Sequence, residues 1–396
     1  MSHNLFWKKS FLLWAVICLN LFGTVQLLSA LSAQPQMVSV TAVSGPIITD
    51  TIWTAANSPY VVTDVVSIQA GVTLTIEPGV VVKAAGPGFA VLSVEDGANL
   101  AAIGLPTMPI TFTSVAESGP DDWADLVVVG TAHFEHVVFM HSYDNLAVYG
   151  ENGGDITIEN SVIKDGTYGM NVPANTLHRL QMSNVTFTNN ITNRVVIIAD
   201  WDHNLVSEVT LSPQPGLDGY EISYPLRIPV NMTFTVEPGV TVLVSGTGYA
   251  ALWVQDGSHL EAIGTPSSPI TFTAANGIGS GEWASLGIGR GTAHFAHVTI
   301  AHSVLGIDIW DQPQGPIIVE NSTIQDGTYG MWMVPEAIHQ LQMSNVSFIN
   351  NVSNRIQIAE TISNTLLGNA VLSSQPGLDG YVLTGPTHFM HLKVSP

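Results

Sequence analysis

The chain has only one cysteine, Cys18, in 396 residues. It lies in an apolar stretch, residues 10–28, which follows Lys8 and Lys9 and leads into a run of small residues. This order is typical of a secretory signal peptide, which we predict over residues 1–33. A retained membrane anchor is the alternative, because about 19 apolar residues just span a bilayer. The exported product would contain no cysteine, which excludes disulfides and thiolate chemistry.

Basic residues are also scarce. The chain has 10 Lys and Arg against 31 Asp and Glu, and removal of residues 1–33 takes away two lysines and no acid, leaving a formal charge of −23. Nucleic acids and anionic membranes both select clustered Lys and Arg, so we expect neither as a partner. Such a composition is compatible with the binding of cations or neutral glycans. We expect a protein that is secreted or held at the cell surface, with a polysaccharide or cell-surface glycan as its partner.

After the signal segment the chain lacks helical periodicity of useful length and consists of repeats. The nine residues from Phe134 follow a pattern of apolar, any, Asn or His, small or Val, any, apolar, any, polar, polar. This pattern returns at Ile158 and again, with the same spacing, at Met182. A second series with this spacing starts at Phe295 and runs to Leu367. A fixed step of about 24 residues with one strand-like core per step predicts a solenoid.

A longer duplication of roughly 160 residues lies above this step. Glu77-Pro78-Gly79, for example, returns as Glu237-Pro238-Gly239. The predicted organisation is a signal peptide over 1–33, a lead-in or cap over 34–60, one unit over 45–220, a second over 221–381, and the start of an incomplete third over 382–396. Open strand edges must be covered, so we expect either truncation or end-to-end assembly with a partner at the C-terminal end.

Short segments of alternating polarity that are rich in β-branched residues, such as residues 72–76, predict strands. A second strand keeps the same step, so each strand is expected to pair in parallel with its counterpart in the next coil. The predicted fold is all-β. It is a parallel β-helix solenoid with rungs of ~24 residues stacked about 4.8 Å apart, built from two duplicated units of ~160 residues.

Three runs carry a resemblance to a known family. They are residues 71–82 (Gly-Val-Thr-Leu-Thr-Ile-Glu-Pro-Gly-Val-Val-Val), residues 263–273 with Ile-Gly-Thr-Pro and Pro-Ile-Thr-Phe-Thr, and residues 282–286 (Glu-Trp-Ala-Ser-Leu). Together they resemble bacterial secreted right-handed parallel β-helix proteins of the pectin-lyase-like superfamily, over essentially the whole exported chain. The resemblance implies the fold and its right-handed coil. It implies no particular activity, because fold does not carry function.

Asn or His occupies the third position of the repeated pattern. His133, His136 and His141 are three imidazoles within nine residues and raise the question of a zinc site. The pattern favours a structural role instead, because side chains at one position of successive coils stack and Asn amides hydrogen-bond along the stack. His141 falls in a column of Asp and Asn that we interpret as a solvated turn. The predicted ladder consists of His136, Asn160, Asn184, His297, Asn321, Asn345 and Asn369.

Asp121, Asp122 and Asp125 form an acidic loop that could hold Ca²⁺ through oxygen ligands. The duplicate of this loop keeps a single carboxylate, Glu282, which favours a solvated turn. A calcium-stabilised stalk is therefore an alternative, and we expect no other cofactor.

The tryptophans are the candidate glycan-binding residues. Trp123 and Trp283 hold matching positions in the two units, and exposed indole rings stack well on sugar rings. Packing over the coil edges is the alternative for both. Several tryptophans on one flank would indicate a glycan groove, and those that occur in one unit only are Trp201, Trp253, Trp310 and Trp332.

The resemblance also implies which catalytic residues an enzyme of this fold would need. Polysaccharide lyases of this fold use a Lys or Arg base beside calcium-binding carboxylates, and the hydrolases use closely placed Asp residues. No such motif is present, and no spacing points to paired acids. We therefore predict no catalytic residues and an exported, non-enzymatic structural or adhesive surface module that binds glycans. A polysaccharide lyase or glycoside hydrolase is the alternative, favoured if a carboxylate meets a base or a second carboxylate in one groove.

Overall fold

The structure is a computed structural model that describes residues 40–86, 88, 91–200, 204–246, 248, 250–359, 370–384 and 392–394. The predicted signal peptide, Trp201 and Asn369 lie outside the described residues, as does most of the predicted third unit. Among the described residues, no helix has the length and apolar character needed to cross a membrane.

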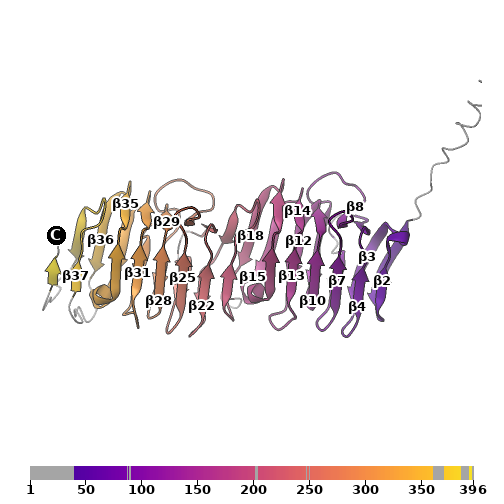
Figure 1. Cartoon of the computed structure of the whole chain (residues 1–396), viewed down its shortest axis with the longest axis horizontal. Coiled ribbons are helices and arrows are strands. Elements are labelled where there is room, and N and C mark those ends of the chain that lie inside the picture. The colour runs from indigo at the N-terminus through magenta and orange to yellow at the C-terminus, as the bar shows by residue number, and fades with distance from the viewer. Residues whose placement is uncertain are drawn as a thin grey trace, which may run out of the picture. The chain divides into compact units, whose positions relative to one another are not determined.

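The described chain is an all-β, right-handed parallel β-solenoid of about 13 turns, as the sequence predicts (Figure 1). Two six-stranded sheets follow one another along the chain. The first contains β2 (Thr51–Trp53), β4 (Thr73–Ile76), β7 (Asn99–Ile103), β10 (Thr131–Glu135), β13 (Ile156–Glu159) and β16 (Leu180–Ser183). The second contains β19 (Val209–Leu211), β22 (Thr233–Val236), β25 (His259–Ile263), β28 (Thr292–Ala296), β31 (Ile317–Glu320) and β34 (Leu341–Ser344).

A seven-stranded sheet covers another side of the later coils. Its strands are β21 (Leu226–Ile228), β24 (Leu252–Val254), β27 (Leu286–Ile288), β30 (Ile307–Ile309), β33 (Tyr329–Met333), β36 (Ser353–Ala359) and β38 (Gly380–Thr384). β37 (Ala370–Leu372) and β39 (Leu392–Val394) form a separate pair. Within the described residues, three 3₁₀ helices interrupt the coils: η1 (Ala55–Asn57), η2 (Ala174–Arg179) and η3 (Pro335–Gln340).

The remaining strands belong to one 18-stranded sheet that bends around the coils. They are β1 (Thr41–Ile47), β3 (Tyr60–Ile68), β5 (Val81–Ala84), β6 (Leu92–Val94), β8 (Ile110–Ser114), β9 (Trp123–Val128), β11 (Val137–Met140), β12 (Ser142–Val148), β14 (Val162–Lys164), β15 (Tyr168–Pro173), β17 (Thr186–Thr188), β18 (Thr192–Ile198), β20 (Gly219–Ile222), β23 (Thr241–Val244), β26 (Ile270–Ala274), β29 (Val298–Ala301), β32 (Thr323–Gln325) and β35 (Ser347–Ile349).

Successive coils pair in parallel, but they differ in length. Ala132 pairs with Ile156 and Ile156 with Leu180, so these two steps along the chain are equal. Leu74, however, pairs with Leu100, which is a slightly longer step, and Leu100 pairs with Ala132, which is longer still. The extra residues lie in the turns, because the strands themselves stay in register. The neighbour of a given side chain in the next coil therefore depends on the local turn length.

Alternate residues of each strand fill the interior of the coils. On β10, Ala132 and Phe134 are buried, while His133 and Glu135 point outward. Phe134 meets Phe139 edge-on with ring centroids 5.3 Å apart. Each large apolar side chain removed from water in this way contributes about 1.5–3 kcal/mol to folding. The outward positions are free of this packing constraint and can carry chemistry.

The corner after each of the last three strands of the first six-stranded sheet, β10, β13 and β16, has a left-handed backbone. His136, Asn160 and Asn184 have φ angles of 49°, 48° and 54°. Asn and His tolerate this region better than most residues. The Asn184 amide donates to the Asn160 amide oxygen at 2.9 Å, and Asn345 donates to Asn321 at 3.0 Å in the second series. These contacts are the ones that a side-chain ladder along successive coils requires.

The first six-stranded sheet ends at β16, and the second begins at β19 without pairing to it. The solenoid nevertheless continues, because β18 pairs with β20 and β20 with β23. Gln214 accepts a hydrogen bond from the Val185 backbone N–H and donates one to the Met182 carbonyl, which covers part of the open edge. A cleft of about 320 Å³ remains between β16 and β19.

Candidate functional site

One outward column of the seven-stranded sheet gathers aromatic and acidic side chains. The register places Trp253 beside Gly287, Gly287 beside Asp308, and Asp308 beside Trp332. In each strand the two flanking residues are buried, so the alternation directs these four positions outward. With the usual strand spacing, Trp253 and Trp332 stand about 14 Å apart. We call Trp253, Gly287, Asp308 and Trp332, together with Trp310, the aromatic column.

Two glycines lie at the centre of the aromatic column, and neighbouring side chains cover both. A Cβ atom on Gly287 would lie 2.8 Å from the Ala250 side chain and 3.5 Å from the Trp253 ring. A Cβ atom on Gly289 would lie 2.6 Å from the ring of Trp310. The Trp310 ring therefore lies against bare backbone, yet its side chain remains 45% exposed. Ala250 and the indole rings thus cover the backbone of these two glycines, which are buried.

Charge in the aromatic column is arranged around these rings. The guanidinium carbon of Arg227, one coil before Trp253, lies 4.9 Å from the Trp253 ring centroid. Asp308 lies between Gly287 and Trp332, and burial raises the pKa of its carboxyl to about 6. Its Oδ1 atom is buried and has no hydrogen-bond partner among the described residues. The carboxyl as a whole is half-buried, and its accessible part can accept a hydroxyl or an N–H from a ligand.

The matching column in the first half of the chain has none of these groups. Its outward residues on β3, β6, β9, β12 and β15 are Ser67, Ser93, Val127, Ala147 and Asn171. Both columns occupy outward positions of the same repeated strands, so the coil folds with either set. The aromatic residues are therefore not required by the fold. An alignment of the two duplicated halves could have drawn attention to Asp308 and Arg227, which sequence reasoning missed.

Trp123 and Trp283, the predicted glycan-binding residues, do not face solvent. Both side chains are 0% exposed. The indole N–H of Trp123 donates to the Met140 carbonyl, and that of Trp283 donates to the Ala301 carbonyl, both at 2.8 Å. A ring enclosed on both faces cannot stack on a sugar, so the glycan-binding prediction for these two residues is corrected here. Their repetition reflects a shared place in the core.

The acidic loop is held by its own hydrogen bonds. Asp122 accepts from the Ser114 hydroxyl and from the backbone N–H and hydroxyl of Ser118. Burial alone would raise the pKa of Asp122, but these hydrogen bonds and one from Gly119 hold it below its usual value. Asp121 accepts a hydrogen bond from Thr167. In the described part of the chain these carboxylates do not form a group of converging ligand atoms, and nothing in the geometry supports calcium at Asp121, Asp122 and Asp125.

Asp125 interacts with a different acid. Burial, with a smaller contribution from the Asp144 carboxylate, raises the pKa of Asp125 to about 6. Burial also raises the pKa of Asp144, which accepts a 2.5 Å hydrogen bond from the Asn171 amide. Asp125 pairs in register with Asn145, the neighbour of Asp144 on β12. Two carboxyl groups with raised pKa values on adjacent strands are an arrangement that proton transfer can use.

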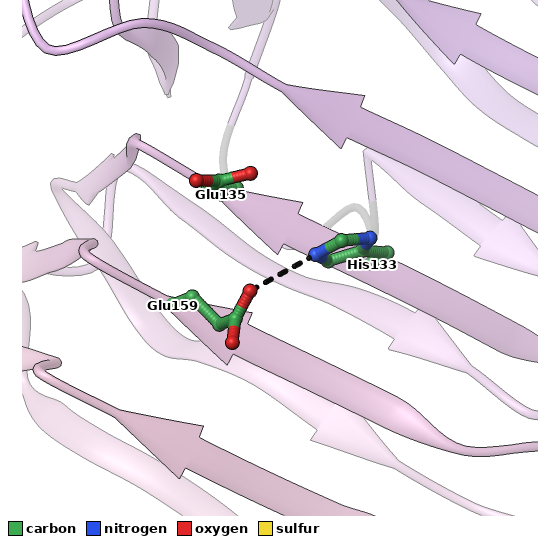
Figure 2. Close-up of side chains that lie close together, drawn as sticks. All are labelled: His133, Glu135 and Glu159. Carbon is green, nitrogen blue, oxygen red and sulfur yellow. Dashed lines mark hydrogen bonds and ion pairs between the residues drawn. The ribbon is translucent and has the colours of Figure 1, made fainter.

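A second cluster lies on the first six-stranded sheet. Figure 2 shows His133 and Glu135 on β10 and Glu159 on the adjacent strand β13. One ligand atom from each side chain lies within 4.8 Å of the other two, the one such group among the described residues. His133 Nε2 is 3.4 Å from Glu159 Oε2. The zinc question raised by the sequence concerned three histidines, whereas the structure joins one histidine to two glutamates from different coils.

Comparison with known proteins agrees with the fold. Residues 45–161 match the family model described as a pectate-lyase-like beta helix domain. No curated protein and no solved structure matches the chain. The predicted resemblance to pectin-lyase-like β-helix proteins is thereby confirmed at the level of the fold.

Proposed function

We propose that this chain, which carries a pectate-lyase-like beta helix domain, is an exported, non-enzymatic surface module that binds glycans through the aromatic column. The observation that carries this proposal is the outward alignment of Trp253, Asp308 and Trp332 on successive strands of one sheet. The acidic composition and the small number of basic residues support a neutral glycan as ligand, because an anionic polymer would be repelled.

The chemistry of the aromatic column suits a sugar ring. An indole ring offers an apolar face that matches the C–H face of a pyranose. The half-buried carboxyl of Asp308 can take a sugar hydroxyl or, when ionised, a protonated amino group. The lack of a side chain at Gly287 and Gly289 lets Ala250 and the Trp310 ring pack directly on the sheet. A short stretch of glycan lying along the coil direction would contact the two outer rings and the carboxylate between them.

Binding of a polysaccharide panel to the full exported chain tests the proposal. We expect saturable binding to at least one neutral or amino-sugar polymer, weakened at least tenfold by Trp253→Ala and by Trp332→Ala. Ser93→Ala is the matched control, since Ser93 is the first-half counterpart of Trp253 and should leave binding unchanged. Absence of binding to every member, or equal affinity of the Trp variants and the parent, would refute the glycan site.

Export is tested separately. Expression of the full-length chain in a secreting host should release a product that begins near residue 34, as measured by intact mass. A product that retains residues 1–33 and stays with the membrane would show that the chain is anchored in the membrane and not secreted.

A glycoside hydrolase is the second candidate, favoured by the carboxyl pair Asp125 and Asp144. General acid catalysis near neutral pH needs a carboxyl whose pKa is raised, and Asp125 has a pKa of about 6. The same panel, followed for reducing ends, distinguishes the candidates. Depolymerisation that disappears in Asp125→Asn would establish the hydrolase and displace the non-enzymatic proposal.

A further inference from the structure

The strand pair β10–β13 places two carboxylates opposite each other. Glu135 and Glu159 are register partners, and both point outward. Directly opposed like charges destabilise a sheet unless something compensates them. In the described part of the chain the ion pairs of these two glutamates involve histidines only: His133 with Glu159, and His136 with Glu135 at 3.8 Å. Neither partner is a Lys or an Arg, so no permanent positive charge offsets the two carboxylates.

The matching place in the second half of the chain lacks this crowding. Ala296 stands where the first half has Glu135, and it pairs with Glu320 on the next strand. In the described chain the carboxylate of Glu320 has one ion-pair partner, the imidazole of His294, at 3.2 Å. The His–Glu contact is therefore common to both halves, whereas the second carboxylate is particular to the first. Three side chains that can bind a metal therefore lie together in the first half, whereas the matching place in the second half has two.

The donor geometry fits a small transition-metal cation. Zinc binds His nitrogen and carboxylate oxygen at about 2.0–2.2 Å, so two ligands of a tetrahedral site lie about 3.3–3.5 Å apart. The Nε2 atom of His133 is 3.4 Å from the Glu159 oxygen. The Glu135 oxygen lies within 4.8 Å of both, and rotation of an outward, partly exposed side chain can close that gap. All three donors point outward from one sheet face, as Figure 2 shows.

We propose that His133, Glu135 and Glu159 bind a divalent transition metal, with Zn²⁺ as the best fit, and leave one coordination position to water. Zinc sites with three protein ligands keep such an open position. The cation would neutralise the opposed carboxylates and join the coils of β10 and β13. The proposal is independent of glycan binding, because the cluster lies on a different sheet from the aromatic column.

Zinc titration of the full exported chain by calorimetry tests the site. We expect one equivalent of Zn²⁺ per chain, with binding weakened at least tenfold by Glu135→Ala, which reproduces the second-half arrangement. Glu159→Gln, which changes one ligand atom while preserving side-chain shape, should have a similar effect. Glu320→Gln, the matched change in the second half, should leave the stoichiometry and affinity unchanged.

Thermal unfolding with and without zinc gives a second readout. The midpoint of the parent chain should rise with zinc concentration, since a ligand that binds only the folded state stabilises it, and the midpoint of Glu135→Ala should rise less at the same zinc concentration. The proposal is overturned if the parent shows no saturable zinc binding, or if Glu135→Ala and Glu159→Gln, both folded by circular dichroism, bind zinc as the parent does.

Discussion

The amide of Asn184 donates a 2.9 Å hydrogen bond to the amide oxygen of Asn160, which lies 24 residues earlier in the chain. Both residues have a left-handed backbone, with φ angles of 54° and 48°. One residue type thus meets two demands: it tolerates the corner, and it links one coil to the next. The same pair of features recurs at Asn321 and Asn345.

Replacement of Asn184 separates these two roles. Asn184→Ala should lower the free energy of unfolding by about 1–3 kcal/mol, because it loses the hydrogen bond and strains the left-handed corner. Asn184→Gly loses only the hydrogen bond and should be less destabilising. Denaturant unfolding measures both. If Ala is tolerated as well as Gly, the left-handed corner does not explain the choice of Asn.

Asp308 should make stability depend on pH. Its pKa is about 6 in the folded chain, above the unfolded value, so the folded state binds the extra proton and stability falls as pH rises from about 4 to 6. Asp308→Asn removes this loss and should be more stable than the parent at pH 7, by at most about 3 kcal/mol for two pKa units. The advantage should shrink towards pH 4. A pH-independent difference in the unfolding free energy would contradict the raised pKa.

Arg179 is a buried structural clamp. The residue is 2% exposed, and its guanidinium donates five hydrogen bonds to backbone carbonyls of two preceding turns, those of Gly154, Tyr149, Gly150, Val129 and Gly130. Arg179→Met should cost at least about 3 kcal/mol, since several buried carbonyls lose their donors. Gln340→Met, at the matching position of η3, should change stability by no more than about 0.5 kcal/mol. Comparable losses in the two variants would argue against the clamp.

Trp123 and Trp283 should matter for stability and not for ligand binding. Trp123→Phe and Trp283→Phe each leave a buried carbonyl without its N–H donor and a small void, at a cost of about 1–3 kcal/mol. Thermal unfolding should report this loss. Affinity for any bound glycan, measured well below the unfolding midpoint, should stay at the parent value; a clear loss would return these rings to the binding site.

Much of the fold is readable from the repeat. The period and the alternating polarity predict parallel coils, and Phe134 and Ile158, where the repeated pattern begins, lie on the parallel strands β10 and β13. The tryptophans show where such reasoning stops. Trp123 and Trp283 lie beside turns, and their side chains are buried. The repeat period alone does not tell whether a residue beside a turn faces the core or the solvent. The structure assigns the outward faces to Trp253, Trp310 and Trp332 instead.

By itself, the sequence determined that one coil lies on the next, because a strand-like phrase repeated at a constant step can bury its apolar face only against its own copies. Tertiary structure decided which outward side chains meet. Trp253, Gly287, Asp308 and Trp332 are neighbours although the three steps between them along the chain all differ in length. Turn lengths differ from coil to coil, and the strand register absorbs those differences through backbone hydrogen bonds that do not depend on side-chain identity. Both the aromatic column and the His133–Glu135–Glu159 cluster follow from that register.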